Sequence, residues 1–358
     1  MKILCVIDSL GSGGAQKQLV ELAKGFHEKG HQVSFLTYHN LDFFKEELIK
    51  NNITVHCIED PSYLKRVWKM RTFIRSGRYD AVLSFLETPN FICEIAGLPF
   101  RKWKLIVGER SANPNIEKSF KLKSYRWFHF LADFVVSNSN TNRDIVKRVN
   151  RLIPLEKLKV IYNLVDTGSY KTIKRSTSQN RLVLLIAASH QKLKNLNGLI
   201  EAVNLLTETE KSKLRIHWYG DEADSSFNNA KNKIQKYSLE DNFVFYKATQ
   251  DIKNRMLEAD IIGLFSFYEG FPNTICEAMS LARPVICSSV SDIPLIMTDA
   301  RYLFDPNKTD EIVQVLSDVL KLNDVELDAM GKANKEIANS LFDKEQIVSQ
   351  YLNLMQQK

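Results

Sequence analysis

Short apolar runs alternate with longer amphipathic stretches along almost the whole chain, and no other feature constrains the fold as strongly. Runs of this length, rich in Val, Ile, Leu and Phe, are typical of strands buried on both faces. In the first half they lie at residues 2–7, 32–37, 54–58, 81–85, 104–107 and 134–137. Amphipathic helical patterns separate them, so consecutive strands would be parallel and joined by crossover helices. The pattern predicts an α/β domain with a doubly wound parallel sheet.

The alternation stops once and then starts again. Residues 166–180 are polar and have the composition of a linker. Further apolar runs follow at residues 182–187, 214–218, 243–246, 261–265 and 284–287. A chain of 358 residues with 44% hydrophobic content can fill two cores. We therefore predict a first domain over 1–165, a second over 166–340, and a C-terminal helix over 341–358 that packs back on the first. Open α/β sheets bind ligands at the carboxyl ends of their strands, so an interdomain cleft is the expected site.

Cysteine, histidine and hydropathy patterns exclude several classes of protein. The five cysteines are scattered without a CxxC pair, which indicates reduced thiols. No apolar run approaches the roughly 20 residues of a membrane span, and the N-terminus is too quickly polar for a signal peptide. The seven histidines lack metal-ligand spacing, and no nucleic-acid-binding motif is present. We expect a cytoplasmic chain that is soluble or at most peripheral to a membrane.

The net charge of +7 is concentrated in the first half, where residues 1–165 carry +10 and the remainder carries −3. Aromatic side chains are interleaved with Lys and Arg in residues 64–75, 100–104 and 120–127. A helix over residues 64–75 would place four apolar side chains near one face, namely Leu64, Val67, Trp68 and Ile74. Surrounding cations would suit an anionic lipid surface. The alternative is a surface helix whose apolar stripe packs on the core, and the sequence leaves both open.

A glycine-rich loop, residues 9–17, follows the first apolar run and leads into a helix. The backbone amides of Gly13 and Gly14 are placed to approach a phosphate. A nicotinamide-binding fold needs a third glycine where Gln16 stands, and an acidic residue after the second strand, where the chain has Tyr-His-Asn. The spacing of a Walker loop is also missing. The sequence therefore disfavours a nicotinamide-dependent enzyme and excludes a Walker-type nucleotide-binding loop.

The most informative motif for function lies at residues 267–277, where Glu269 and Glu277 bracket a turn that opens a helix. The helix would begin at Thr274, with Asn273 or Thr274 as its cap. Its first N–H groups lack intrahelical partners and would donate to a phosphate or to sugar hydroxyls. The two glutamates would hold two parts of one phosphorylated sugar. Taken alone, the spacing also allows a solvated Glu269 and a Glu277 that only favours the helical turn.

With the other motifs in order, the chain resembles the retaining nucleotide-sugar glycosyltransferases of family 4. These enzymes have the GT-B architecture, in which two Rossmann-like domains face an interdomain cleft. The resemblance covers nearly the whole chain. Its motifs are Gly13-Gly14, Lys194-Asn195, Tyr219-Gly-Asp221, Glu269-Gly-Phe-Pro-Asn, Glu277-Ala-Met, Arg283-Pro-Val-Ile and Leu303-Phe-Asp-Pro306.

The resemblance implies roles in binding a nucleotide-diphosphate sugar. Lys194 would pair with the diphosphate, to which Gly13 and Gly14 would add amides. Glu269 would lie close to the donor sugar, and Glu277 would accept hydrogen bonds from the ribose hydroxyls. The rest of the donor site would comprise Gly220, Gly270, Phe271, Pro272, Asn273 and Thr274. The base would lie near Tyr246 and Ala248, although these residues also suit a plain strand and turn. Similar enzymes have an arginine where this chain has Ser189, so His190 would supply the missing charge.

The acceptor side departs from the family pattern. Many relatives carry a histidine after the fifth strand, where this chain has Glu109 and Arg110. These two residues would orient an acceptor hydroxyl or bind its phosphate, and with Lys194 and Glu269 they are the candidate catalytic residues. An interdomain ion pair is the alternative. Asn138 and Ser139, after the next strand, are expected to be structural.

The resulting hypothesis is a retaining transferase that moves a hexose or N-acetylhexosamine from a nucleotide-diphosphate sugar, with UDP favoured, to a surface-glycan or lipid-linked acceptor. The bond formed would be α-glycosidic. No cofactor or metal is expected, since the chain has no Asp-x-Asp pair. An anionic membrane is an expected partner, at the inner face of the cell membrane, and nucleic acid is not. A transferase acting on a soluble sugar and a non-catalytic scaffold of the same fold are the alternatives.

Overall fold

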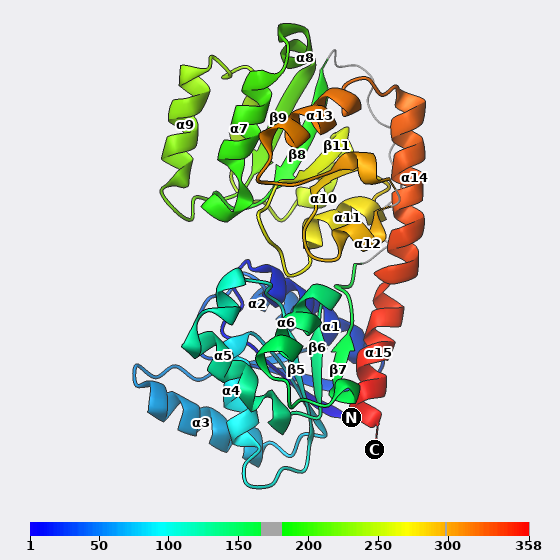
Figure 1. Ribbon diagram of the computed structural model, residues 1–358. Helices are drawn as coiled ribbons and strands as arrows, with labels where there is room; N and C mark the ends of the chain where they lie inside the picture. The colour runs from blue at the N-terminus through cyan, green and yellow to red at the C-terminus, as the bar shows by residue number, and fades with distance from the viewer. Residues whose placement is uncertain (166–180, 298, 358) are drawn as a thin grey trace. The chain divides into compact units, whose positions relative to one another are not determined.

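The computed structural model describes residues 1–165, 181–297 and 299–357, and these form two compact units (Figure 1). Met1–Leu164 and Lys344–Lys358 make up the first unit, and Val165–Asp343 the second. The division after Leu164 lies one residue before the predicted boundary. The return to the first unit begins at Lys344, three residues later than predicted. The predicted linker, residues 166–180, lies outside the described residues.

The first unit is built on a parallel sheet of seven strands in the order β3-β2-β1-β4-β5-β6-β7. The strands are β1 (Lys2–Val6), β2 (Gln32–Thr37), β3 (Thr54–Cys57), β4 (Ala81–Phe85), β5 (Lys104–Glu109), β6 (Phe134–Ser137) and β7 (Leu158–Val160). Six of them were predicted from their apolar runs. The seventh, β7, was missed because three residues are too few to show a local pattern.

Helices cover both faces of this sheet (Figure 1). They are α1 (Gly14–Glu28), α2 (Lys45–Lys50), α3 (Tyr63–Ser76), α4 (Glu87–Ala96), α5 (Phe120–Trp127), α6 (Asn140–Val149) and α15 (Lys344–Gln356), with short 3₁₀ turns η1 (Pro114–Glu117), η2 (Phe128–Leu131) and η3 (Leu155–Lys157). Alternate residues of β1 point to opposite faces. Ile3 and Cys5 pack with α1, α2 and α15, whereas Leu4 and Val6 pack with α3 and α4.

The second unit has a parallel sheet of six strands in the order β10-β9-β8-β11-β12-β13. The strands are β8 (Leu182–Ala187), β9 (Leu214–Tyr219), β10 (Phe243–Tyr246), β11 (Ile261–Leu264), β12 (Val285–Ser288) and β13 (Leu303–Phe304). Five were predicted. The two-residue β13 was not predicted as a strand, and its pairing with β12 defines it.

Around this second sheet lie eight helices of the described residues. They are α7 (Leu196–Leu205), α8 (Glu208–Lys213), α9 (Ser226–Lys236), α10 (Ile252–Glu258), α11 (Asn273–Ser280), α12 (Ile293–Ile296), α13 (Thr309–Val319) and α14 (Asp324–Leu341), with the turns η4 (Lys192–Lys194) and η5 (Ala300–Tyr302). The core on one face is formed by the buried sides of α7, α9 and α13 against β8 and β9. None of the helices in the described part of the chain has the length and apolar content needed to cross a membrane.

Candidate functional site

The loops after β8 and β11 are joined by a backbone hydrogen bond at the carboxyl edge of the second sheet. The amide of Phe267 donates to the carbonyl of Leu193 at 3.0 Å. Lys194 is the last residue of η4, and Asn195 follows it in the left-handed conformation with φ 57°. The Asn195 side chain accepts from the amide of Gly198 and so caps α7. Lys194 is therefore held in a fixed turn next to the loop that carries Glu269.

Lys194 and Glu269, predicted to bind different parts of one ligand, contact each other. The Lys194 Nζ lies 2.6 Å from Glu269 Oε1. The Ser266 hydroxyl donates to the same oxygen at 2.7 Å. No hydrogen bond to Oε2 comes from the described residues, and the glutamate side chain stays 15% exposed. The cluster thus combines one ammonium with one carboxylate oxygen that accepts no hydrogen bond from the described residues.

Helix α11 begins at Asn273, one residue earlier than predicted, and its N-cap is Pro272. The predicted cap residue, Asn273 or Thr274, is wrong, because Pro272 stands at the N-cap and has no side chain that could bond to the first amides. The Thr274 hydroxyl donates to the carbonyl of Ala187 on β8. Glu277 is buried on this helix. The first N–H groups of α11 carry the positive end of the helix dipole close to Glu269 in sequence. The predicted binding of an anion at this turn stays a prediction.

The residues between Glu269 and α11 are fixed by contacts on both sides. The Ser291 hydroxyl donates to the carbonyl of Gly270 at 2.5 Å. The Phe271 ring is buried and lies edge-on to Phe342, with 5.6 Å between ring centroids. The Phe271 side chain is therefore part of the core.

Gly220 lets two backbone segments approach at the carboxyl ends of β8 and β9. A Cβ atom at Gly220 would lie 1.9 Å from the carbonyl oxygen of Ala188. That oxygen also accepts a hydrogen bond from Trp218 Nε1 at 2.7 Å. Gly220 thus shapes the loop by its lack of a side chain.

The predicted base-binding residues lie at the end of β10. The Tyr246 ring is partly exposed and stacks on Tyr219, with 4.5 Å between centroids and 14° between planes. The amide of Ala248 donates to Asp221 Oδ1 at 3.2 Å. Its N–H group is therefore already used within the fold.

His190 does not supply the positive charge expected of it. The imidazole is only 3% exposed and stacks on Phe227, with 3.9 Å between centroids, and on Trp218. Burial among these rings lowers the pKa of His190, only partly offset by the carboxylate of Glu222. A neutral ring that belongs to the core cannot replace the missing arginine, so this prediction is wrong.

In the first unit, the glycine loop leads into α1 as predicted. Gly13 is the N-cap of the helix and Gly14 its first residue. Gln16 donates from Nε2 to Asp8 Oδ1 at 2.9 Å, so the residue that replaces the third glycine of a dinucleotide motif ties the loop to the end of β1. The first turn of α1 contains no acidic residue, so it adds no negative charge to the positive end of the helix dipole.

Glu109 is a buried partner of two cations and does not face solvent. It ends β5 and is 3% exposed. Its Oε2 lies 2.6 Å from Arg126 and its Oε1 lies 2.9 Å from His129 Nε2. Burial opposes the charge, but Arg126 and His129 outweigh it and hold the pKa of Glu109 below its usual value. A direct contact between this carboxylate and an acceptor is therefore excluded by its burial.

Arg110 is held within the first unit as well. Its guanidinium lies 3.7 Å from the centroid of the Phe85 ring. It donates to Asn163 Oδ1 at 3.2 Å and also to the hydroxyl of Tyr351 on α15. Glu109 pairs with cations of its own unit, whereas the hydrogen-bond partners of Arg110 are neutral. The alternative of an interdomain ion pair through Arg110 stays a prediction.

Two family models match the chain. Glycosyltransferase Family 4 matches residues 12–169, and Glycosyl transferases group 1 matches residues 170–337. Together they account for almost every element of both sheets.

The chain is a family 4 glycosyltransferase.

Two named relatives agree with this assignment. The transferase is 25% identical over 293 residues to GalNAc-alpha-(1->4)-GalNAc-alpha-(1->3)-diNAcBac-PP-undecaprenol alpha-1,4-N-acetyl-D-galactosaminyltransferase of Campylobacter jejuni, covering 78% of this chain and 77% of that protein. It is 22% identical over 375 residues to N-acetyl-alpha-D-glucosaminyl L-malate synthase of Bacillus anthracis, covering 95% and 92%.

Among solved structures, the transferase is similar to Anabaena HepE in complex with UDP and glucose. The TM-score is 0.87 at 18% identity, and the match covers 100% of both chains. This likeness confirms the GT-B fold, with its two parallel sheets of seven and six strands. The predicted cleft between the domains stays a prediction.

Sequence reasoning missed the buried charges around Glu109. Arg126 and His129 are fully buried, and the second nitrogen of His129, Nδ1, lies 2.7 Å from Glu94 Oε1. Arg126 also donates to Glu87 at 3.3 Å. A signal was present in the sequence, because Arg126 and His129 are three positions apart and side chains at this spacing lie on the same side of a helix. The interleaved aromatic and cationic residues of 120–127 instead suggest a basic surface.

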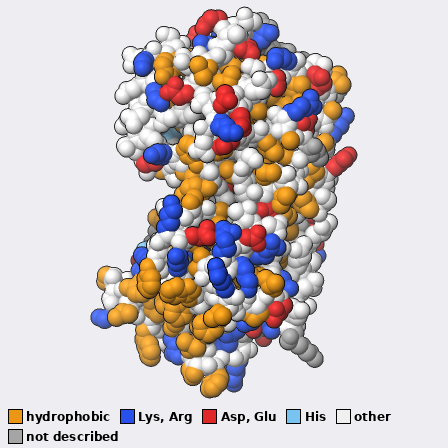
Figure 2. Space-filling view, in the orientation of Figure 1, with side chains coloured by type: hydrophobic (Ala, Val, Ile, Leu, Met, Phe, Trp, Pro, Cys, Tyr) orange, Lys and Arg blue, Asp and Glu red, His pale blue; other side chains and the backbone are white. Residues whose placement is uncertain are grey.

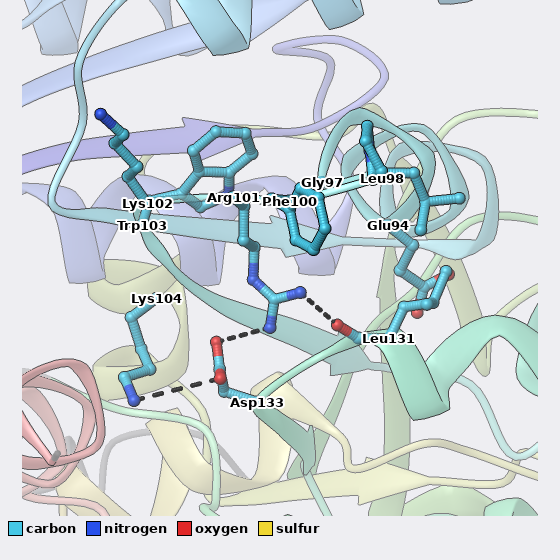
Figure 3. Close-up of a pocket in the computed structure, with 11 residues that line it drawn as sticks. Glu94, Gly97, Leu98, Phe100, Arg101, Lys102, Trp103, Lys104, Leu131 and Asp133 are labelled. Atoms are coloured by element: carbon cyan, nitrogen blue, oxygen red, sulfur yellow. Dashed lines mark hydrogen bonds and ion pairs between the residues drawn. The ribbon is translucent and has the colours of Figure 1, made fainter.

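A cavity of about 470 Å³ lies in the first unit at the amino end of β5 (Figure 3). It contains none of the predicted site residues. Arg101 crosses it and donates to the carbonyl of Leu131 at 2.6 Å and to Asp133 at 2.8 Å. Phe100 and Lys102 form part of its lining. Parallel sheets bind ligands at the opposite edge, so we do not assign the sugar donor to this cavity.

Proposed function

We propose that this glycosyltransferase moves a hexose or N-acetylhexosamine from a UDP-sugar to a surface-glycan or lipid-linked oligosaccharide acceptor, with retention of the anomeric configuration. The observation that carries the proposal is the cluster of Lys194, Glu269 and Ser266 beside the first turn of α11. The Campylobacter jejuni relative, whose name includes an undecaprenol-linked glycan, supports the acceptor class. The HepE complex with UDP and glucose supports the donor.

The cluster matches the charges that such a transfer produces. As the bond between the anomeric carbon and the diphosphate breaks, negative charge grows on the leaving oxygen and positive charge on the sugar ring. The Lys194 ammonium and the α11 amides would stabilise the diphosphate, and the open Oε2 of Glu269 would face the sugar.

Retention would follow from departure and attack on the same face of the sugar. The acceptor oxygen forms its bond to the anomeric carbon on the face from which the diphosphate leaves, and the leaving phosphate oxygen takes the acceptor proton. This route uses no protein nucleophile. It also uses no metal, so we expect transfer to persist in excess chelator; complete loss that added Mg²⁺ restores would contradict this part of the proposal.

The test of the site compares Lys194→Ala with Lys192→Ala, an exposed lysine of the same turn. Donor turnover is measured by mass spectrometry of the product formed from UDP-sugars and a lipid-linked or soluble glycan. We expect Lys194→Ala to lower kcat/KM by about 100-fold or more, as for other groups that stabilise a leaving anion, with Lys192→Ala close to wild type. Equal activities of the two variants would contradict the assignment. The anomeric configuration of the product, read by NMR, tests retention.

We also propose that the transferase works at an anionic membrane surface, through α3 and the loop after α4. On α3, Met70 and Ile74 pack into the core, whereas Leu64 and Trp68 are 78% and 66% exposed. The single apolar face predicted for this helix is therefore wrong, because Ile74 and the partly buried Val67 pack against the core, away from the exposed Leu64 and Trp68. Phe100, in the neighbouring loop, is 83% exposed. Hydrophobic side chains gather over the part of the first unit that contains α3, α4 and α5, with Lys and Arg among them (Figure 2).

Arginines of α3 fix the loop that carries Phe100. Arg75 donates to the carbonyls of Ala96, Leu98 and Phe100, at 2.9 to 3.2 Å, and Arg71 donates to Leu98. The Arg71 guanidinium also lies 5.5 Å from the centroid of the Trp68 ring. Exposed apolar side chains and cations on this surface of α3 and the Phe100 loop complement an anionic bilayer.

Liposome co-sedimentation tests the membrane proposal. Wild type should bind phosphatidylglycerol vesicles and release them in high salt, with weak binding to phosphatidylcholine. The double variant Leu64→Ala/Trp68→Ala should lose most of this binding, whereas Val325→Ala, an exposed residue of the second unit, should retain it. Vesicle binding that depends neither on lipid charge nor on the substitutions would contradict the membrane proposal. Full activity on a soluble acceptor would then favour the alternative of a transferase that acts on soluble sugars.

A further inference from the structure

Glu269 receives two hydrogen bonds on one oxygen, and the two donors differ in kind. Lys194 is charged and 21% exposed, whereas Ser266 is neutral and 1% exposed. Both contact Oε1, at 2.6 and 2.7 Å. The other oxygen, Oε2, accepts no hydrogen bond from the described residues. The carboxylate is thus oriented from one side only.

The two donors respond differently to a bound diphosphate. An ammonium group has three N–H donors and is drawn toward added negative charge, so Lys194 would shift at least partly toward the phosphate oxygens. The serine hydroxyl is neutral and its residue is packed directly after β11, between Phe265 in the core and Phe267, whose amide bonds to Leu193. Ser266 would keep its place when Lys194 moves.

We propose that Ser266 is a positioning residue that holds the Glu269 carboxylate toward the donor sugar while Lys194 turns to the diphosphate. The inference rests on the proposed function. Without Ser266, the long glutamate side chain would regain rotamers, and its carboxylate would be oriented only by Lys194, which also pairs with the diphosphate. Each would lower the fraction of molecules with Oε2 in its reacting position.

A positioning role and a purely structural role for Ser266 predict different effects on UDP binding, turnover and thermal stability. The hydroxyl touches Glu269, which contacts the sugar, so UDP alone should bind normally to a Ser266 variant. Turnover of the UDP-sugar should fall. A structural role would instead lower the thermal midpoint and weaken UDP binding together.

The experiment uses the full chain with Ser266→Ala, Ser266→Thr and Ser280→Ala. Ser280 is a matched control on α11, because it is also buried and its hydroxyl donates to the backbone carbonyl of Glu277 rather than to a side chain. We expect Ser266→Ala to lower kcat by about tenfold, the usual effect of a lost hydrogen bond to a charged group, with UDP affinity within about twofold of wild type. Ser266→Thr, which keeps the hydroxyl, should recover most of the loss, and Ser280→Ala should stay near wild type.

A double-mutant cycle with Glu269→Ala provides the second test. If Ser266 acts through Glu269, adding Ser266→Ala to Glu269→Ala should change kcat/KM by less than about twofold. Independent, multiplying losses would overturn the proposal, as would a Ser266→Ala variant as active as wild type. If wild type transfers sugar from none of the nucleotide sugars, the proposed function fails and this inference fails with it. An active wild type with an unaffected Ser266→Ala overturns the inference alone.

Discussion

At the scale of single residues, the site depends on side chains that are absent as much as on those present. Gly220 allows the ends of β8 and β9 to touch, because a Cβ atom there would lie 1.9 Å from the Ala188 carbonyl oxygen. The clash is with backbone, which cannot rotate away as the end of a side chain can. The loop would therefore have to move, and with it the turn that leads to Lys194.

We predict that Gly220→Ala destabilises the chain by about 1–3 kcal/mol, the usual range for an overpacked site, and weakens UDP binding. The measurement is chemical denaturation together with UDP titration. Gly11→Ala is the control, because a Cβ there would meet its nearest neighbour at an ordinary 3.5 Å. Equal stabilities for the two variants would show that the second unit relaxes around the added methyl group.

His190 shows at the same scale why a charge cannot be assigned from a motif position. Its place in the sequence, four residues before Lys194, suited a cation for the diphosphate. Three aromatic rings from α9, β9 and β10 surround it in the fold. An uncharged imidazole is the form that such an environment favours.

At the scale of elements, one buried charge network ties β5 to α4, α5 and η2. His129 donates to Glu94 through Nδ1 and to Glu109 through Nε2, and Arg126 joins Glu109 to Glu87. Burial opposes the imidazolium, but Glu94 and Glu109 outweigh it and raise the pKa of His129 to about 9. An imidazolium with both nitrogens donating satisfies an oxygen of each carboxylate.

The network predicts a loss of stability at alkaline pH. His129 has a pKa of about 6.5 in the unfolded chain and about 9 when folded, so folding favours the protonated ring. Its contribution is complete below about pH 6.5 and declines as pH rises toward 9. We expect the free energy of unfolding of wild type to fall across this window more steeply than that of His129→Gln, measured by urea denaturation at each pH. Parallel slopes would contradict an imidazolium at this position.

Removing the histidine should also be costly at neutral pH. His129→Gln leaves at least one buried carboxylate short of a cation, and loss of one partner from such a pair costs roughly 3–5 kcal/mol. A change below about 1 kcal/mol would mean that the carboxylates take up protons or water instead.

At the scale of the whole molecule, the chain ends in the unit where it began. Helix α15 contributes Ile347, Val348, Tyr351, Leu352 and Met355 to the core that α1 also fills. A Cβ at Gly25 of α1 would lie 2.4 Å from Val348, so the two helices pack without space for a larger residue. Tyr351 also holds Arg110 near the end of β5. The last helix is therefore part of the first domain's fold.

We predict that deletion of residues 344–358 unfolds the first unit. Each of the five apolar side chains contributes roughly 1.5–3 kcal/mol by burial, a sum comparable with the whole stability of a domain. Limited proteolysis with mass spectrometry should show rapid cleavage within residues 1–164. Deletion of residues 357–358 alone is the control and should leave the fragment pattern unchanged. A protected first unit after the longer deletion would contradict this account.

The sequence by itself determined the class of fold, the order of strands and helices, and the family. Strand periodicity and the motifs from Gly13 to Pro306 are local, so each could be recognised without knowing its neighbours in space. The short strands β7 and β13 were not predicted, because only their pairing with β6 and β12 defines them as strands.

Only the tertiary structure decided which charges meet. Glu109 contacts Arg126 and His129, which are 17 and 20 residues away on other elements. Glu269 contacts Lys194, which is 75 residues away. The fold also decided which side chains lose water, as His190 and His129 show with opposite pKa shifts. Burial and the distance between charges set the energy of an ionisable group, and both are properties of the folded chain that no local pattern contains.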